Sequence, residues 1–288
     1  MERCIGTFVS PFWLGQYGMT GKETVEIRME DPRHLLCPAR LDLVSKILYV
    51  RSRLSGRGRL FSHALYRACI RAFLGPCYNE VGTTGKVGIR RHYLCFNDLI
   101  DNAVTRGIDP AISAVSLTND GVVIDGAHRT ATAYVLGQKV PVFEIPGVER
   151  NCNDAFFRSR GLDRVFLESL AYSYASLIKN PAVLLLTLTS NEMERRVARD
   201  VVTLCAPLAC ECMLDKSTVL YVLGCENAWD SSLLLSALTD TYQFQFQSGT
   251  NALHLIKTKL RIGSFSYLIR FAWACLIINM RDFLQIRV

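Results

Sequence analysis

The chain has 288 residues, of which 50% are hydrophobic and 20% are charged; this is enough apolar surface for two folded domains and excludes a disordered chain. The excess of 33 basic over 26 acidic residues gives a net charge of +7, which favours anionic partners. Eleven scattered cysteines with no secretory signal ahead of them predict reduced thiols and a cytoplasmic location. No stretch reaches the roughly 18 uncharged apolar residues of a transmembrane segment.

The chain begins with an extension, residues 1–34, in which 24–29 alternate like a strand. Two helices are expected next, the first from about residue 38 and the second over 60–73, separated by the break at 55–58. This helical lead-in is basic and contains a single acid, Asp42. It predicts contact with a polyanion or a phosphate-rich ligand, or else a solvated helical face. Its basic residues are Arg40, Lys46, Arg51, Arg53, Arg57, Arg59, Arg67 and Arg71.

Residues 80–88 form a loop with three glycines, one acid and one lysine. The loop matches neither a Walker A sequence nor a dinucleotide fingerprint. Glu80 and Lys86 are nevertheless candidates for an acidic and a cationic contribution to a phosphate site formed elsewhere in the domain. The alternative is a loop that only turns the chain.

The most informative pattern lies at residues 122–136, where three β-favouring residues enter an Asp125-Gly126 turn that opens a helix. A second strand is expected at 140–145. The turn delivers His128 and Arg129 to a helix N-terminus, where unpaired N–H groups and the helix dipole attract anions. We therefore predict a phosphate or carboxylate site, with Arg129 as a bidentate donor. Its residues are Gly126, Ala127, His128, Arg129 and Thr130. Alternatively, Asp125 only caps the helix, and His128 and Arg129 pair with nearby carboxylates.

This order of strand, Asp-Gly-Ala-His-Arg turn, helix and closing strand resembles the ParB/sulfiredoxin superfamily over about residues 90–146. The resemblance implies a ParB/sulfiredoxin-like domain at 35–150 whose turn cradles nucleotide phosphates. Ala127 stands where sulfiredoxins carry their nucleophilic cysteine, so thiol repair chemistry is not expected. Asp125 and His128 are closer to the kinase-like branch. A fainter likeness to bacterial proteins associated with surface-polysaccharide synthesis suggests a sugar as acceptor.

The resemblance implies an enzyme that transfers a phosphoryl group from ATP or another nucleotide, with Mg²⁺, to the hydroxyl of a small molecule or sugar. In this hypothesis Arg129 and Lys86 neutralise the phosphates, and His128 binds the transferred group. Asp125 or Glu80 acts as the base or as a magnesium ligand. The alternative is a non-catalytic or ParB-like nucleic-acid-binding module, and a degenerate copy of the fold is a third interpretation.

Residues 151–288 are expected to form a second, smaller α/β domain, which makes the whole chain α/β of the α+β type. Strands are expected at 183–188, 218–223 and 242–246, with the last at a sheet edge, and helices at 191–204 and 228–238. Cys210-x-Cys212 lacks the partners of a zinc site, so buried thiols are expected there.

The end of the chain carries an apolar stripe at three- and four-residue steps, which predicts a helix whose stripe faces the core. A helix lying on a membrane surface is the less favoured alternative. Residues 284–288 alternate like the start of a strand, which predicts that this domain is a truncated version of a longer architecture. The stripe consists of Ile262, Phe265, Ile269, Trp273, Leu276 and Met280.

Overall fold

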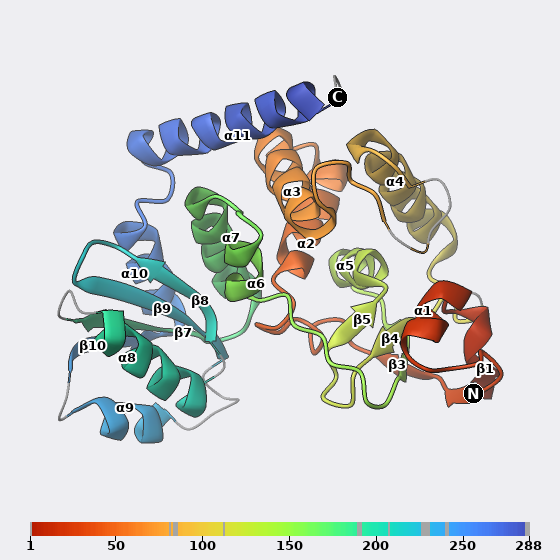
Figure 1. Ribbon diagram of the computed structural model, residues 1–288, viewed down its shortest axis with the longest axis horizontal. Helices are drawn as coiled ribbons and strands as arrows, with labels where there is room; N and C mark the ends of the chain where they lie inside the picture. Colours follow the sequence, from red (N-terminus) through yellow and green to blue (C-terminus); the bar gives the residue numbers. More distant parts are fainter. Residues whose placement is uncertain are drawn as a thin grey trace. The chain divides into compact units, whose positions relative to one another are not determined.

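The computed structural model describes residues 2–80, 82, 86–111, 113–188, 192–206, 208–225, 231–239 and 242–285. The protein is a mixed α/β protein (Figure 1) that divides into two compact units. The first unit comprises Met1–Leu36, Asp42–Asn151 and Ile278–Val288, and the second comprises Cys37–Leu41 and Cys152–Ile277.

The first unit contains two sheets and five α-helices within the described residues. Its strands are β1 (Glu2–Cys4), β2 (Thr24–Glu26), β3 (Arg28–Glu30), β4 (Val115–Leu117), β5 (Val123–Asp125) and β6 (Val140–Glu144). Its helices are the 3-10 turn η1 (Ile5–Thr7), α1 (Pro11–Gln16), α2 (Asp42–Ser55), α3 (Arg59–Leu74), α4 (Ile89–Arg106) and α5 (Ala127–Leu136), followed by the end of α11.

The central sheet of the first unit has the strand order β3-β6-β4-β5. Strands β4 and β6 are parallel, because the chain between them crosses over through β5 and α5, and the other two pairings are antiparallel. The N-terminal segment covers one face with an apolar cluster that includes Ile5, Leu14 and Phe143. Helix α5 packs against β4 and β6, and α2 packs against α5 (Figure 1).

The helices of the first unit enclose an aromatic cluster, which includes Tyr49 of α2, Tyr66 of α3 and Phe96 of α4. These rings lie with their centroids 4.9 to 5.5 Å apart. The expected helix at 60–73 is confirmed as α3, and the strand expected at 140–145 is confirmed as β6. The strand expected at 24–29 is present but interrupted at Ile27: β2 pairs with β1, whereas β3 pairs with β6 in the other sheet.

The second unit contains one antiparallel sheet with the strand order β10-β7-β9-β8. Its strands are β7 (Pro181–Thr187), β8 (Leu208–Met213), β9 (Thr218–Cys225) and β10 (Gln243–Ser248). Its helices are α6 (Asp154–Ser159), α7 (Arg164–Leu177), α8 (Glu192–Cys205), α9 (Ser231–Thr239), α10 (Gly249–Lys259) and the first part of α11 (Phe265–Gln285).

From β7 to β10 the chain runs β-α-β-β-α-β, and its strand order is that of the split β-α-β, or ferredoxin-like, arrangement. The expected strands at 183–188, 218–223 and 242–246 are confirmed, and β10 is an edge strand as predicted. Strand β8 was not predicted. Residues 189–191 and 226–230, where the sequence places two helix starts, lie outside the described residues.

Helix α11 differs from its sequence prediction in two ways. Its apolar stripe does not face the core: Phe265 is 79% exposed and Trp273 is 62% exposed. The buried positions are instead Tyr267, Ala274 and Asp282, on the other side of the helix. The strand expected from residue 284 is also wrong, because α11 continues to Gln285, and residues 286–288 lie outside the described residues. None of the helices in the described part of the chain has the length and apolarity to cross a membrane.

Candidate phosphate site

The strand–turn–helix expected at residues 122–136 is present: β5 ends at Asp125, Gly126 forms the turn, and α5 begins at Ala127. Gly126 has φ 90° and ψ 18°, a left-handed conformation that favours glycine. A Cβ at this position would lie 2.8 Å from Cγ2 of Val115 and 3.2 Å from its Cα. The glycine therefore lets the start of α5 approach strand β4.

His128 lies in the first turn of α5 and is directed towards α3 and α4. Its Nε2 is 3.0 Å from the hydroxyl of Tyr66, and its ring meets that of Phe96 edge-on at a centroid distance of 4.4 Å. Burial, reinforced by the charges of Lys46 and Lys86, holds the pKa of His128 well below its usual 6.5. The imidazole is therefore neutral at pH 7 and can donate or accept a hydrogen bond.

Two lysines from distant parts of the chain act on this same imidazole. Lys46 of α2 is almost fully buried and forms an ion pair of 2.7 Å with Asp42. Lys86 forms an ion pair of 3.0 Å with Glu80. Both ammonium charges lower the pKa of His128, while the charge of Glu80 adds to the burial that raises the pKa of Tyr66. The charges of Lys46, Lys86 and Glu80 thus act on His128 or on Tyr66, the residue to which His128 is hydrogen-bonded.

Asp125 and Arg129 have different neighbours from His128. Arg129 donates through Nη1 to the carbonyl of Ala114, just before β4, and its Nη2 lies 3.4 Å from the Asp125 carboxylate. The Asp125 side chain is 60% exposed, and its charge is one of those that raise the pKa of Tyr17, after burial as the main cause. Asp125 makes no capping hydrogen bond to α5. The guanidinium of Arg129 therefore ties the helix to the strand.

Ala127 and Thr130 complete the predicted set and are both buried. The Thr130 hydroxyl donates to the Gly126 carbonyl at 3.2 Å, and its amide donates to the same oxygen at 2.9 Å. The Thr130 side chain thus stabilises the first turn of α5. The amides of residues 127–129 precede the first complete helical hydrogen bond, and these N–H groups are the ones an anion can use.

The basic lead-in is largely engaged within the first unit and in the segment Cys37–Leu41. Arg40 is buried. Arg53 binds Asp101 at 2.7 Å, and Arg67 and Arg71 both pair with Asp282. The interpretation as a solvated basic face therefore does not hold for these residues, because their guanidinium groups have acidic partners or are buried. Arg51, Arg57 and Arg59 are exposed.

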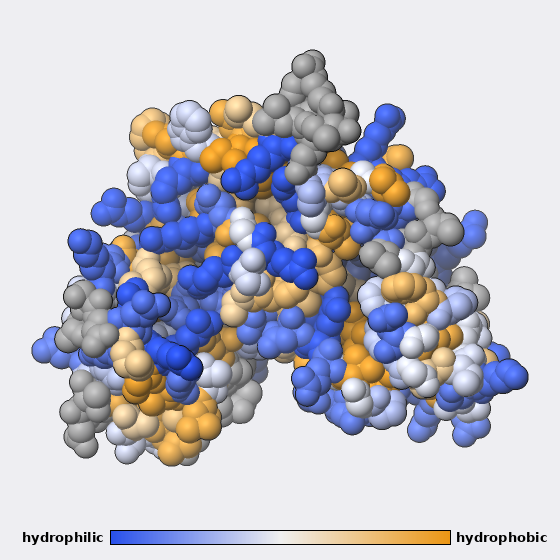
Figure 2. Space-filling model, viewed as in Figure 1, coloured by the Kyte–Doolittle hydropathy of each residue, from blue (hydrophilic) through white to orange (hydrophobic). Residues whose placement is uncertain are grey.

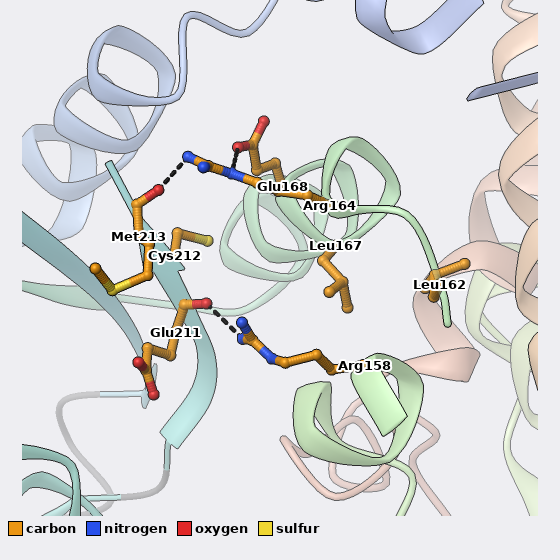
Figure 3. A pocket seen from close by; sticks show the side chains of 8 residues that line it. All are labelled: Arg158, Leu162, Arg164, Leu167, Glu168, Glu211, Cys212 and Met213. Atoms are coloured by element: carbon orange, nitrogen blue, oxygen red, sulfur yellow. Dashed lines mark hydrogen bonds and ion pairs between the residues drawn. The ribbon is translucent and has the colours of Figure 1, made fainter. Parts of the chain in front are cut away.

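The second unit holds an open hollow of about 120 Å³, lined by Arg158, Leu162, Arg164, Leu167, Glu168, Glu211, Cys212 and Met213. Figure 3 shows two arginines reaching from α6 and α7 to the backbone of β8. Arg158 donates to the Glu211 carbonyl at 2.8 Å, and Arg164 donates to the Met213 carbonyl and binds Glu168. The Glu211 amide donates to Asp154 at 3.2 Å. These side chains bind the outer edge of β8 and one another. We therefore interpret them as groups that stabilise the second unit and not as a ligand site.

One thiol of the cysteine pair beside this hollow, that of Cys210, keeps its proton. The sulfur atoms of Cys210 and Cys212 lie 3.7 Å apart, and the hydrogen bond between them, together with burial, raises the pKa of Cys210 well above its usual value. A thiol that keeps its proton is a poor metal ligand. Within the described ranges, no group of three or more His, Cys, Asp or Glu residues could hold a metal ion.

The neutral His128 predicts a pH dependence of stability. Its pKa is lowered in the native state, so below pH 6.5 the unfolded chain binds a proton that the native protein does not, and stability falls as the pH falls. His63, whose pKa is lowered mainly by burial, acts in the same direction. We expect His128→Gln to flatten the decline between about pH 7 and pH 5, by at most about 1.4 kcal/mol per pH unit.

The measurement is urea unfolding at a series of pH values, compared as slopes because His128→Gln also loses ring contacts. His34→Gln is the matched control, since His34 is an exposed histidine whose side chain is 72% accessible. An unchanged slope in His128→Gln would show that this imidazole binds a proton as readily in the native protein as in the unfolded chain.

No family model, no curated protein and no solved structure matches this chain.

Proposed function

We propose that the first unit binds nucleotide phosphates at the start of α5 and transfers a phosphoryl group to the hydroxyl of a small molecule or sugar, as the resemblance to the ParB/sulfiredoxin superfamily implies. The observation that carries the proposal is the position of His128 in the first turn of a helix, where the charge of Lys86 acts on its neutral imidazole. The ammonium group of Lys86, a neutral imidazole and helix-terminal amides form a set of donors suited to a polyphosphate.

Each group has a proposed role. Lys86 neutralises the phosphates, the amides of residues 127–129 hold phosphate oxygens, and His128 donates to the transferred group. Glu80, whose charge acts on Tyr66, is the carboxylate proposed as base towards the acceptor hydroxyl. We assign Arg129 to holding β4 against α5, because its guanidinium already binds Ala114 and Asp125.

ATP or another nucleotide is the proposed donor, and Mg²⁺ is proposed to arrive with its phosphates. Magnesium commonly binds through substrate phosphates and only one or two carboxylates, so a complete protein cage is not needed. Because Glu80 is proposed as the base, Asp125, whose carboxylate is exposed, is the carboxylate proposed to bind Mg²⁺. The carboxylate of Glu80 is close to Lys86 and would be released when phosphates take its place.

The test is Lys86→Ala, with Lys139→Ala as a matched control on an exposed lysine. Losing one charge-assisted hydrogen bond costs about 1.5–3 kcal/mol, so the affinity for MgATP should fall by roughly 10- to 100-fold. The melting temperature without ligand should stay nearly unchanged, because the Lys86–Glu80 pair is partly exposed, with side chains 33% and 29% accessible. Isothermal titration with a panel of nucleotides, with and without Mg²⁺, measures the first quantity and thermal shift measures the second.

If no nucleotide binds the wild type, the phosphotransferase proposal is wrong. Salt-dependent binding to arbitrary duplex DNA would then favour the nucleic-acid-binding module. Five phosphate contacts would give a slope of about −4 to −5 in log K against log salt. A smaller slope is expected here, because Arg53, Arg67 and Arg71 are engaged with Asp101 or Asp282.

A further inference from the structure

The outer face of α11 is an exposed apolar surface. Phe265 is 79% exposed, Trp273 62%, Leu276 46% and Ile269 43%. Figure 2 shows hydrophobic side chains gathered over the part of the surface that α11 occupies in Figure 1. Large exposed apolar residues are ordinary when they are scattered, but a contiguous set on one helix marks an interaction surface.

The spacing of these residues separates this face from the side that packs on the protein. Phe265, Ile269, Trp273 and Leu276 follow one another at steps of four, four and three, which places them along one side of the helix. Tyr267 and Ala274 are buried on the opposite side. The Tyr267 hydroxyl lies 2.6 Å from that of Ser169 on α7, which fixes the orientation of the helix within the second unit.

The chain that leads into this helix carries an excess of cations. Residues 242–281 contain five Lys or Arg residues and no Asp or Glu. Lys257 and Lys259 at the end of α10 and Arg261 in the following turn are all exposed. Arg270 lies within the helix itself, where it binds Glu168 of α7 at 3.0 Å. A surface that joins aromatic and aliphatic side chains to an excess of cations fits an anionic lipid interface.

We infer that the outer face of α11 binds an anionic membrane surface, with Phe265, Ile269, Trp273 and Leu276 inserted among the acyl chains and the cations of residues 257–261 facing the headgroups. Charge argues against a second copy of the chain as the occupant, because symmetric pairing would set these cations against one another. Tryptophan suits a lipid interface because its ring is apolar while its N–H can remain hydrated. This inference is independent of the proposed phosphate site.

The experiment is vesicle flotation of the full chain, with vesicles of equimolar phosphatidylcholine and phosphatidylserine compared with phosphatidylcholine alone. The apolar-face variant is Ile269→Gln/Trp273→Gln. Its matched control is Met193→Gln/Leu204→Gln on α8, two apolar residues that are 63% and 87% exposed. All four side chains point to solvent, so these variants should fold normally.

Wild type and the α8 control should bind the anionic vesicles, and the apolar-face variant at least about tenfold more weakly. Lys257→Gln/Lys259→Gln should weaken binding roughly tenfold and leave little preference for the anionic lipid. Equal binding of wild type and the apolar-face variant would overturn the inference. Equal binding of the wild type to vesicles with and without phosphatidylserine would also overturn it. A concentration-dependent dimer abolished by Ile269→Gln/Trp273→Gln, with no vesicle binding, would show that a second copy covers the face.

Discussion

Lys46→Met is expected to lower the free energy of unfolding of the first unit by about 3–5 kcal/mol. The Lys46 and Asp42 side chains are only 5% and 3% exposed, and their charged atoms lie 2.7 Å apart. Removing the ammonium group leaves a carboxylate in a site that water hardly reaches, and the loss of its partner is what costs stability. Equilibrium urea unfolding measures the difference.

The double variant Asp42→Asn/Lys46→Met shows whether the stability lost in Lys46→Met comes from the buried charge of Asp42 or from lost packing. Because it removes both charges, it should recover most of the stability that Lys46→Met loses. Lys139→Met, at an exposed lysine, should change stability little. A loss for Lys46→Met as small as that of Lys139→Met would mean that the Asp42–Lys46 pair is hydrated in solution.

Gly126→Ala is expected to destabilise the first unit by roughly 2–5 kcal/mol, for two reasons that act together. At φ 90° an alanine is strained, and its Cβ would lie 2.8 Å from the Val115 side chain and 3.2 Å from the Val115 backbone. Strain and overpacking each cost about 1–3 kcal/mol. Because β4 is a buried strand of the central sheet, its backbone has little room to move away.

Gly137→Ala is the control for the effect of φ alone. Gly137 ends the same helix at φ 66°, but nothing lies within 4 Å of its Cβ position. Gly137→Ala should therefore lower the free energy of unfolding only by the cost of the left-handed conformation. This loss is clearly smaller than the loss expected for Gly126→Ala. Equal losses in urea unfolding would show that the contact with Val115 is relieved at no cost.

Local patterns predicted the turn region because local chemistry decides it. A β-favouring run, an Asp-Gly pair and a helix-forming segment ending in glycine fix β5, α5 and their connection without reference to the rest of the chain. The strands of the second unit were predicted for the same reason, since runs such as 183–188 are uniformly apolar and bounded by turns. Strand β8 was missed because Leu208–Met213 mixes apolar residues with a glutamate that Arg199 binds at 3.3 Å.

Tertiary contacts decided what the sequence did not show. Lys46 is one of eight cations in its segment, and nothing in that pattern distinguishes the buried one from exposed ones such as Arg57. The direction of the His128 ring depends on Tyr66 and Phe96, which come from two other helices. Helix α11 is apolar on more than one side, so its periodicity could not tell which side packs on the protein.

The side chains that bind the outer edge of β8 also govern what can join this sheet. A bare edge strand is a template on which another polypeptide can add a strand, as in domain swapping and fibre growth. At β8, Asp154, Arg158 and Arg164 already use the Glu211 amide and the carbonyls of Glu211 and Met213. An incoming strand that pairs with Glu211 and Met213 would have to break three charge-assisted hydrogen bonds, so the sheet resists polymerisation through this part of its edge.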